Sequence, residues 1–94
     1  MSAWIETEKG SLVKADSLII SIRQAQGSAD YEVTVNTGPS PAVFASGLTD
    51  EASARRIRTS IALHVDRAGN APGSTCISFA TSPRPAVQSL PMDD

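Results

Sequence analysis

The stretch Ala42–Gly69, AVFASGLTDEASARRIRTSIALHVDRAG, contains the change from strand to helix that decides the fold. Its first part, AVFASG, is a short apolar run closed by Gly47, and it predicts a strand. Thr49 is a suitable N-cap for a helix. The carboxylates of Asp50 and Glu51 follow in the first turn, where the positive end of the helix dipole favours them. We therefore expect a strand followed directly by a helix.

A periodic stripe of side chains defines the face that this helix buries. Residues spaced by three and four positions lie on one face of a helix, and here they are Ala54, Ile57, Ile61, His64, Val65 and Ala68. Gly69 stands where a left-handed C-cap is expected, and Pro72 prevents the helix from continuing. The helix is therefore expected at about residues 50–68.

Upstream of this stretch, the chain alternates between apolar and polar residues as strands do. Residues 31–37, YEVTVNT, place Tyr31, Val33 and Val35 on one face. Residues 17–26, SLIISIRQAQ, place Leu18, Ile20 and Ile22 on one face, with Ile19 as a misfit that a partly covered second face would accommodate. Residues 3–7, AWIET, and 12–14, LVK, flank Gly10, which is free to take a positive φ, so they predict a hairpin.

Strands that follow one another through short turns favour an antiparallel meander. The sequence thus predicts an α+β fold, in which an antiparallel sheet of four or five strands carries one C-terminal helix packed on one face. The expected core consists of the apolar faces of these elements: Ile5, Leu18, Ile20, Ile22, Tyr31, Val33, Val35, Phe44, Ile57, Ile61 and Val65.

The segments after the helix are less regular. TCISFA, residues 75–80, could form a last strand that joins a sheet edge or pairs with another chain. From Thr81 onward, TSPRPAVQSLPMDD holds three prolines and ends in two aspartates, which is typical of a disordered tail. The domain prediction is one α+β domain at residues 1–80 and a disordered, proline-rich tail at residues 81–94.

Composition excludes several kinds of chemistry. The 94 residues fit one domain, and a single cysteine, Cys76, and a single histidine, His64, leave no intramolecular disulfide and too few ligands for a common zinc site. The glycine-rich phosphate motifs and the GxSxG nucleophile elbow are absent. We therefore expect no catalytic residue, cofactor or metal, with His64 packed against the sheet through one hydrogen bond and Cys76 a small buried residue.

No charged and apolar leader opens the sequence, and no apolar run approaches the roughly 20 residues of a membrane span. A cytoplasmic protein that does not bind membranes is the expected class.

Three arginines, Arg55, Arg56 and Arg58, crowd four positions of a chain whose net charge is -2. They form either the solvated side of a helix or, with Arg67, a surface that contacts nucleic acid. Glu51 precedes Arg55 by four residues, the favourable order for an ion pair on one helix face. No aromatic residue lies among the arginines for base stacking. The sequence favours the solvated face, with nucleic acid as the alternative.

Leu63 lies off the buried stripe of the helix, so it is either singly exposed or covered by residues 75–80 or by a second copy. The expected function is a non-enzymatic interaction module that associates with itself as a homodimer, or docks another protein, through a sheet edge or the outer helix face. The candidate interaction residues are Leu63, Arg56, Thr59, Ile77 and Phe79. A nucleic-acid-associated protein ranks second, and a small enzyme or ligand binder using the crevice between sheet and helix ranks third.

The runs WIETEKGSLVKADSLIISI, YEVTV and VFASGLTDEASARRI together resemble a class of small bacterial single-domain proteins of uncharacterised function. The likeness extends from Trp4 to about Ala68. It rests on turn, core and cap positions: Trp4, Gly10, Leu12, Ile22 and Thr49. The resemblance implies a short meander followed by a capped helix, and it transfers no catalytic residue.

Overall fold

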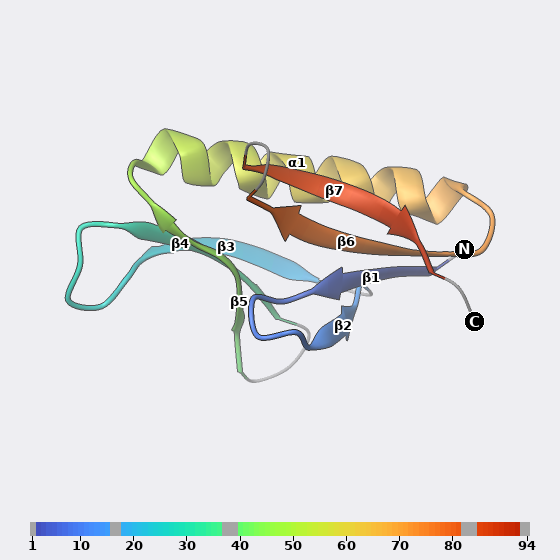
Figure 1. The fold of residues 1–94 in the computed structure, drawn as a ribbon, viewed down its shortest axis with the longest axis horizontal. Helices are drawn as coiled ribbons and strands as arrows, with labels where there is room; N and C mark the ends of the chain where they lie inside the picture. The colour runs from blue at the N-terminus through green and yellow to red at the C-terminus, as the bar shows by residue number, and fades with distance from the viewer. Residues whose placement is uncertain (1, 16–17, 37–39, 82–84, 93–94) are drawn as a thin grey trace.

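The computed structural model describes residues 2–15, 18–36, 40–81 and 85–92. Seven strands and one helix follow one another along these residues (Figure 1). In chain order they are β1 (Ser2–Glu6), β2 (Leu12–Lys14), β3 (Ile19–Gln24), β4 (Tyr31–Asn36), β5 (Ala42–Leu48), α1 (Glu51–Asn70), β6 (Ser74–Ala80) and β7 (Ala86–Pro91). The α+β class predicted from the sequence is confirmed.

The strands form two sheets, so the prediction of a single sheet of four or five strands is wrong. One sheet has three strands in the order β3-β4-β5, all antiparallel. The other has four strands in the order β2-β1-β6-β7, with β1 and β6 parallel. The predicted hairpin forms from β1 and β2 around Gly10, whose φ is +87°. Because β6 returns beside β1 after the helix, this hairpin belongs to a different sheet from the meander that follows it.

The helix begins and ends later than predicted. Asp50, rather than Thr49, is the N-cap: its backbone is extended, and its side chain accepts a hydrogen bond of 2.7 Å from the Ser53 N–H. At the other end Gly69 lies inside the helix, and Ala71 is the C-cap, donating its N–H to the Ala68 carbonyl over 3.3 Å. The carboxylate three residues before Ser53 thus displaces the predicted threonine cap.

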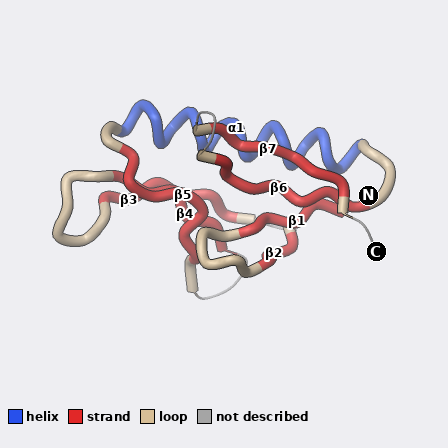
Figure 2. The backbone as a smooth tube through the Cα atoms, in the orientation of Figure 1, coloured by secondary structure: helices blue, strands red, loops and turns tan. Residues whose placement is uncertain are grey.

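The helix lies across both sheets, as the tube in Figure 2 shows. Five of the predicted core residues are buried, and they are Ile5, Val33, Val35, Phe44 and Ile61. The other predicted members are only partly buried but pack against these five: Leu18, Ile20, Ile22, Tyr31, Ile57 and Val65. Since the helix and both sheets supply buried residues, one core joins the helix to both sheets.

Strand β6 lies in the interior of its sheet, between β1 and β7. Residues 75–80 therefore pair within the chain and do not form an edge strand. Ile77 is fully buried, and the ring of Phe79 lies 6.1 Å from that of Phe44, centroid to centroid. Ile77 consequently cannot serve as the exposed interaction residue that the sequence predicted, and Phe79 is partly buried against the core.

Strand β7 occupies part of the segment predicted to be a disordered tail. Residues 86–91 pair antiparallel with β6, from Ala80↔Ala86 to Thr75↔Pro91, which corrects the prediction for these six residues. The reason is tertiary, because β6 offers its free edge to a segment whose own pattern is weak. Residues 82–84 and 93–94 of the predicted tail lie outside the described residues.

Candidate interaction site

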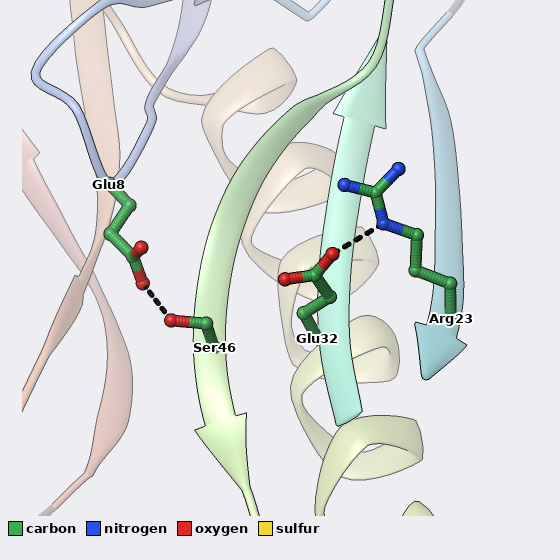
Figure 3. A network of polar contacts seen from close by, with 4 residues as sticks. All are labelled: Glu8, Arg23, Glu32 and Ser46. Atoms are coloured by element: carbon green, nitrogen blue, oxygen red, sulfur yellow. Dashed lines mark hydrogen bonds and ion pairs between the residues drawn. The ribbon is translucent and has the colours of Figure 1, made fainter. Parts of the chain in front are cut away.

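The two sheets have four outer strands, β2, β3, β5 and β7, and these strands differ in how many backbone groups they leave free for another strand. The outer side of β5 is covered by the turn between β1 and β2. Glu8 donates its backbone N–H to the Val43 carbonyl over 2.8 Å. The Ser46 hydroxyl donates to the Glu8 carboxylate over 2.5 Å, as Figure 3 shows. An incoming strand therefore meets this turn rather than free backbone groups.

The outer strands of the four-stranded sheet offer little backbone for pairing. Strand β2 has only three residues. In β7, the Met92 N–H donates to the Ser74 carbonyl over 2.9 Å, and this bond extends the β6–β7 register by one pair. Antiparallel pairs alternate between bonded and non-bonded, so the backbone groups that point away from the sheet belong to Val87, Ser89 and Pro91. Proline has no N–H, which leaves two outward donors.

Strand β3, the second outer strand of the three-stranded sheet, presents more free backbone groups. The Ala25 N–H donates to the Asp30 carbonyl over 2.8 Å and extends the β3–β4 register by one pair. By the same alternation, the backbone groups of Ile20, Ile22 and Gln24 point away from β4. No proline interrupts the strand. This edge therefore presents three donors and three acceptors that make no backbone bond within the described residues.

A groove runs along this edge, beside the first half of α1. Residues 20–24 and Tyr31 form its strand side, and Glu51, Arg55 and Arg58 form its helix side. The three helix residues are spaced by four and three positions, so they lie on one flank of α1. We call this flank, Glu51, Arg55 and Arg58, the β3-side flank.

Charges on both sides of the groove are partly paired. Glu51 and Arg55 form the ion pair predicted from their spacing, with 2.6 Å between Oε2 and Nη2. On the strand side, Arg23 Nε lies 2.5 Å from Glu32 Oε1, the contact drawn across β3 and β4 in Figure 3. Arg58 is half-buried and forms no ion pair with the other described residues. The groove thus holds one cation whose charge is not balanced within the described part of the chain.

Three of the five predicted interaction residues lie together, and the other two lie elsewhere. Leu63 is 52% exposed, and Arg56 and Thr59 are exposed beside it, where they line a shallow hollow on the outer side of α1. Ile77 and Phe79 lie in the sheet below the helix. The outer helix face and residues 75–80 are therefore separate features rather than one surface.

The arginines predicted for the nucleic-acid alternative are also divided. Arg55 and Arg58 line the groove beside β3, whereas Arg56 lies beside Ile57 and Pro85 near the start of β7. Arg67 is exposed in the last turn of the helix. Arg55 and Arg56 also line the outer hollow beside Leu63, but Arg58 and Arg67 do not, so the four arginines form no single basic surface.

His64 is half-buried and contacts the sheet, at the edge of the core, on the helix face that the sequence predicts. Its Nδ1 contacts the Ser89 hydroxyl on β7. Burial, and then the nearby Arg67 guanidinium, hold the pKa of His64 below its ordinary value of 6.5. Nucleophilic use of such a serine–histidine contact requires a group that orients the imidazole and stabilises its cation. The charged neighbour here is itself a cation.

Cys76 lies in the interior strand β6 and is partly buried. Burial, followed by the charge of Glu6, raises the pKa of its thiol above 9.0. A thiol of this kind is the opposite of a reactive cysteine, whose pKa is lowered by cations. Among the described residues, no three His, Cys, Asp or Glu side chains gather as metal ligands do.

No protein-family model, curated protein or solved structure matches this chain. Within the described residues, α1 lacks the apolar length that crossing a membrane requires.

The sequence pattern of β3 contained a signal for this site. Ile19 broke the alternation of its strand, and a covered second face was expected to explain it. Instead Ile19 is 60% exposed. A strand with three isoleucines, one of them exposed on an otherwise polar face, and without proline was thus an indication of an edge able to accept a partner strand.

Proposed function

We propose that this protein is a non-enzymatic interaction module that binds an extended protein segment as an additional strand on the edge of β3. The observation that carries the proposal is the free edge of this strand, where the backbone groups of Ile20, Ile22 and Gln24 point away from the sheet. The other three edges are short, covered or interrupted by proline.

Strand addition suits this edge for a physical reason. In this mode of recognition, main-chain hydrogen bonds supply affinity, and pockets beside the strand supply specificity. The groove between β3 and the β3-side flank lies where alternate side chains of an added strand project. Ile20 and Ile22, partly buried, provide apolar contact on the same side.

The nucleic-acid alternative has weaker support. Phosphate binding needs several cations held together on one surface. The helix arginines are divided between two flanks, and Arg55 is already paired with Glu51.

A phage-displayed library of unstructured peptides tests the proposal directly. Enriched peptides are expected to slow hydrogen exchange at the amides of Ile20, Ile22 and Gln24, because those N–H groups become bonded on binding. Peptides that bind while these three amides still exchange at their free rate would overturn the proposal, as would a monomeric protein for which the library yields no binder.

Gln24 offers a matched pair of variants for this experiment. Gln24→Pro removes an outward N–H without removing a bond to β4, so it is expected to weaken peptide binding while the fold is kept. Gln24→Ala keeps the N–H and removes only the exposed side chain, so peptide binding is expected to remain. Equal binding by the two variants would contradict strand addition at this edge.

A further inference from the structure

We infer that the segment bound at β3 is the β3 strand of a second copy of this chain, in an antiparallel dimer whose two-fold axis passes beside Ile22. This inference rests on the proposed function, because it names the partner of the same edge. Two features carry it: the backbone register that the strand permits with itself, and the order of charges on the β3-side flank.

The backbone register follows from the outward groups. An antiparallel pairing centred on Ile22 places Ile22 opposite the partner's Ile22 and Ile20 opposite the partner's Gln24. Every outward residue of β3 then faces an outward residue, and each such pair exchanges two hydrogen bonds. β3 thus pairs with itself without an orphan donor, whereas β7 has Pro91 among its three outward residues.

The direction of the helix along β3 follows from the sheet register. Gln24 pairs with Tyr31, and Tyr31 pairs with Leu48, three residues before α1 begins. Glu51 therefore lies toward the Gln24 end of the groove, and Arg58, about 10 Å farther along the helix axis, lies toward the Ile20 end.

An antiparallel dimer reverses this order in the partner. Its two-fold axis is perpendicular to the sheet, so both helices lie on the same face and run in opposite directions. Glu51 then faces the partner's Arg58, and Arg58 faces the partner's Glu51. Arg55 lies between them and approaches the partner's Arg55 near the axis, where each is held by its own Glu51. The two ends of the flank, Glu51 and Arg58, are thus complementary in charge to those of its own reversed copy.

Reciprocal charge reversal tests this arrangement. The wild-type mass, measured by sedimentation over a range of concentrations, is expected to show a dimer. Glu51→Arg and Arg58→Glu each place like charges across the interface, so each is expected to raise the dimer dissociation constant roughly tenfold or more. Mixed in equal amounts, the two variants are expected to form a heterodimer, because each supplies the charge that the other lacks.

Two further variants make the outcome decisive. Arg56→Glu changes a charge of the same helix outside the β3-side flank and is expected to leave the dimer unchanged. Ser21 is exposed, and its backbone is bonded to Thr34 of β4, so Ser21→Lys is expected to keep the fold. In the dimer, however, the new lysine lies opposite the partner's Arg23. Ser21→Lys is therefore expected to dissociate the dimer. Because it does not alter the helix, it remains a valid test if Glu51→Arg disturbs the first turn of α1. Circular dichroism verifies that each variant is folded.

Three results overturn the inference. They are a wild-type monomer at every concentration, a dimer that survives Ser21→Lys, and a mixture of Glu51→Arg with Arg58→Glu that stays monomeric. If the protein is a monomer but still binds library peptides through the amides of Ile20, Ile22 and Gln24, the dimer is contradicted and the proposed function is not. If the protein is a monomer and binds no such peptide, both the dimer and the proposed function are contradicted.

Discussion

Strands β3 and β7 are both six residues long, both form the outer edge of a sheet, and both lie beside the same helix. They differ in what their free edges present. β7 has Pro91 among its outward residues, and its Ser89 hydroxyl is in contact with His64 of α1. β3 carries no proline and three outward pairs of donor and acceptor. Free edges are normally blunted because they aggregate, and an edge left open is consequently a candidate for a specific partner.

The contrast between the two edges does not extend to apolar exposure. Ile19 on β3 is 60% exposed and Leu90 on β7 is 52% exposed, so both edges carry an apolar side chain in solvent. Exposure of a leucine or isoleucine alone therefore does not distinguish them. The distinction comes from the backbone, since only β3 can extend its ladder without leaving an acceptor opposite a proline.

The largest expected effect on stability comes from the hydrophobic core, against which both edge strands pack. Ile61 is fully buried in the core that joins the helix to both sheets. Ile61→Ala should reduce the free energy of unfolding by about 2–5 kcal/mol, because it leaves a cavity as well as losing buried area. Urea denaturation measures this loss, and amide exchange should rise in β3 and β7 together. A variant as stable as the wild type would refute the assigned helix face.

A pair of proline substitutions separates the two sides of β3. Arg23→Pro removes the N–H that bonds to the Glu32 carbonyl, together with the ion pair between the two side chains. It should cost about 1–3 kcal/mol of stability, chiefly because the Glu32 carbonyl is left without its donor. Gln24→Pro removes an outward N–H and should cost less than about 1 kcal/mol. Thermal denaturation of the two variants compares them, and equal losses would show that the inferred alternation of bonded pairs is wrong.

Restoring the missing backbone N–H at position 91 should make the β7 edge more able to pair with another strand, as the β3 edge is proposed to do. Pro91→Thr, introduced together with Ser21→Lys to block β3, adds an outward N–H to β7. A symmetric pairing of β7 with its copy gains two hydrogen bonds, each worth about 0.5–1.5 kcal/mol, so weak self-association should increase by up to roughly a hundredfold. Sedimentation of the double variant against Ser21→Lys alone makes the comparison. An unchanged mass would mean that proline is not what limits the β7 edge.

The smallest expected effect is the pH dependence of the β7 contact. The pKa of His64 is below 6.5 in the folded chain, so the unfolded chain takes up its proton first as the pH falls. The stability that the neutral ring contributes is present above pH 6.5 and is lost as the pH falls through the folded pKa. Urea midpoints at about pH 7.5 and 5.5 should differ less in His64→Gln than in the wild type.

Amide exchange locates this effect. On acidification, the amides of Val87 and Ser89 should lose protection, because Ser89 is in contact with His64. Those of β3 are expected to keep theirs, since no described histidine lies beside that strand. Equal loss at both edges would indicate that another group controls the acid response.

Local sequence patterns predicted the elements well. The alternation in YEVTVNT became β4, the Gly10 turn became the β1–β2 hairpin, and the stripe containing Ile61 became the buried face of α1. Each of these depends on side chains close in sequence, where burial of one face enforces a period of two or of three to four. The Glu51–Arg55 pair was predictable for the same reason.

Pairing between distant segments was not predictable in this way. Backbone hydrogen bonds carry no sequence preference of their own, so the sequence did not indicate that β6 joins β1 in parallel or that β7 forms within a proline-rich segment. Sequence by itself thus determined the helix, most of the strands and the centre of the core. Only the tertiary structure decided which strands became edges, and hence that Ile20, Ile22 and Gln24 present their backbone outward beside Arg58. The reason is that a strand is an edge only because no other strand pairs with one of its sides, and pairing between distant segments is a property of the tertiary structure.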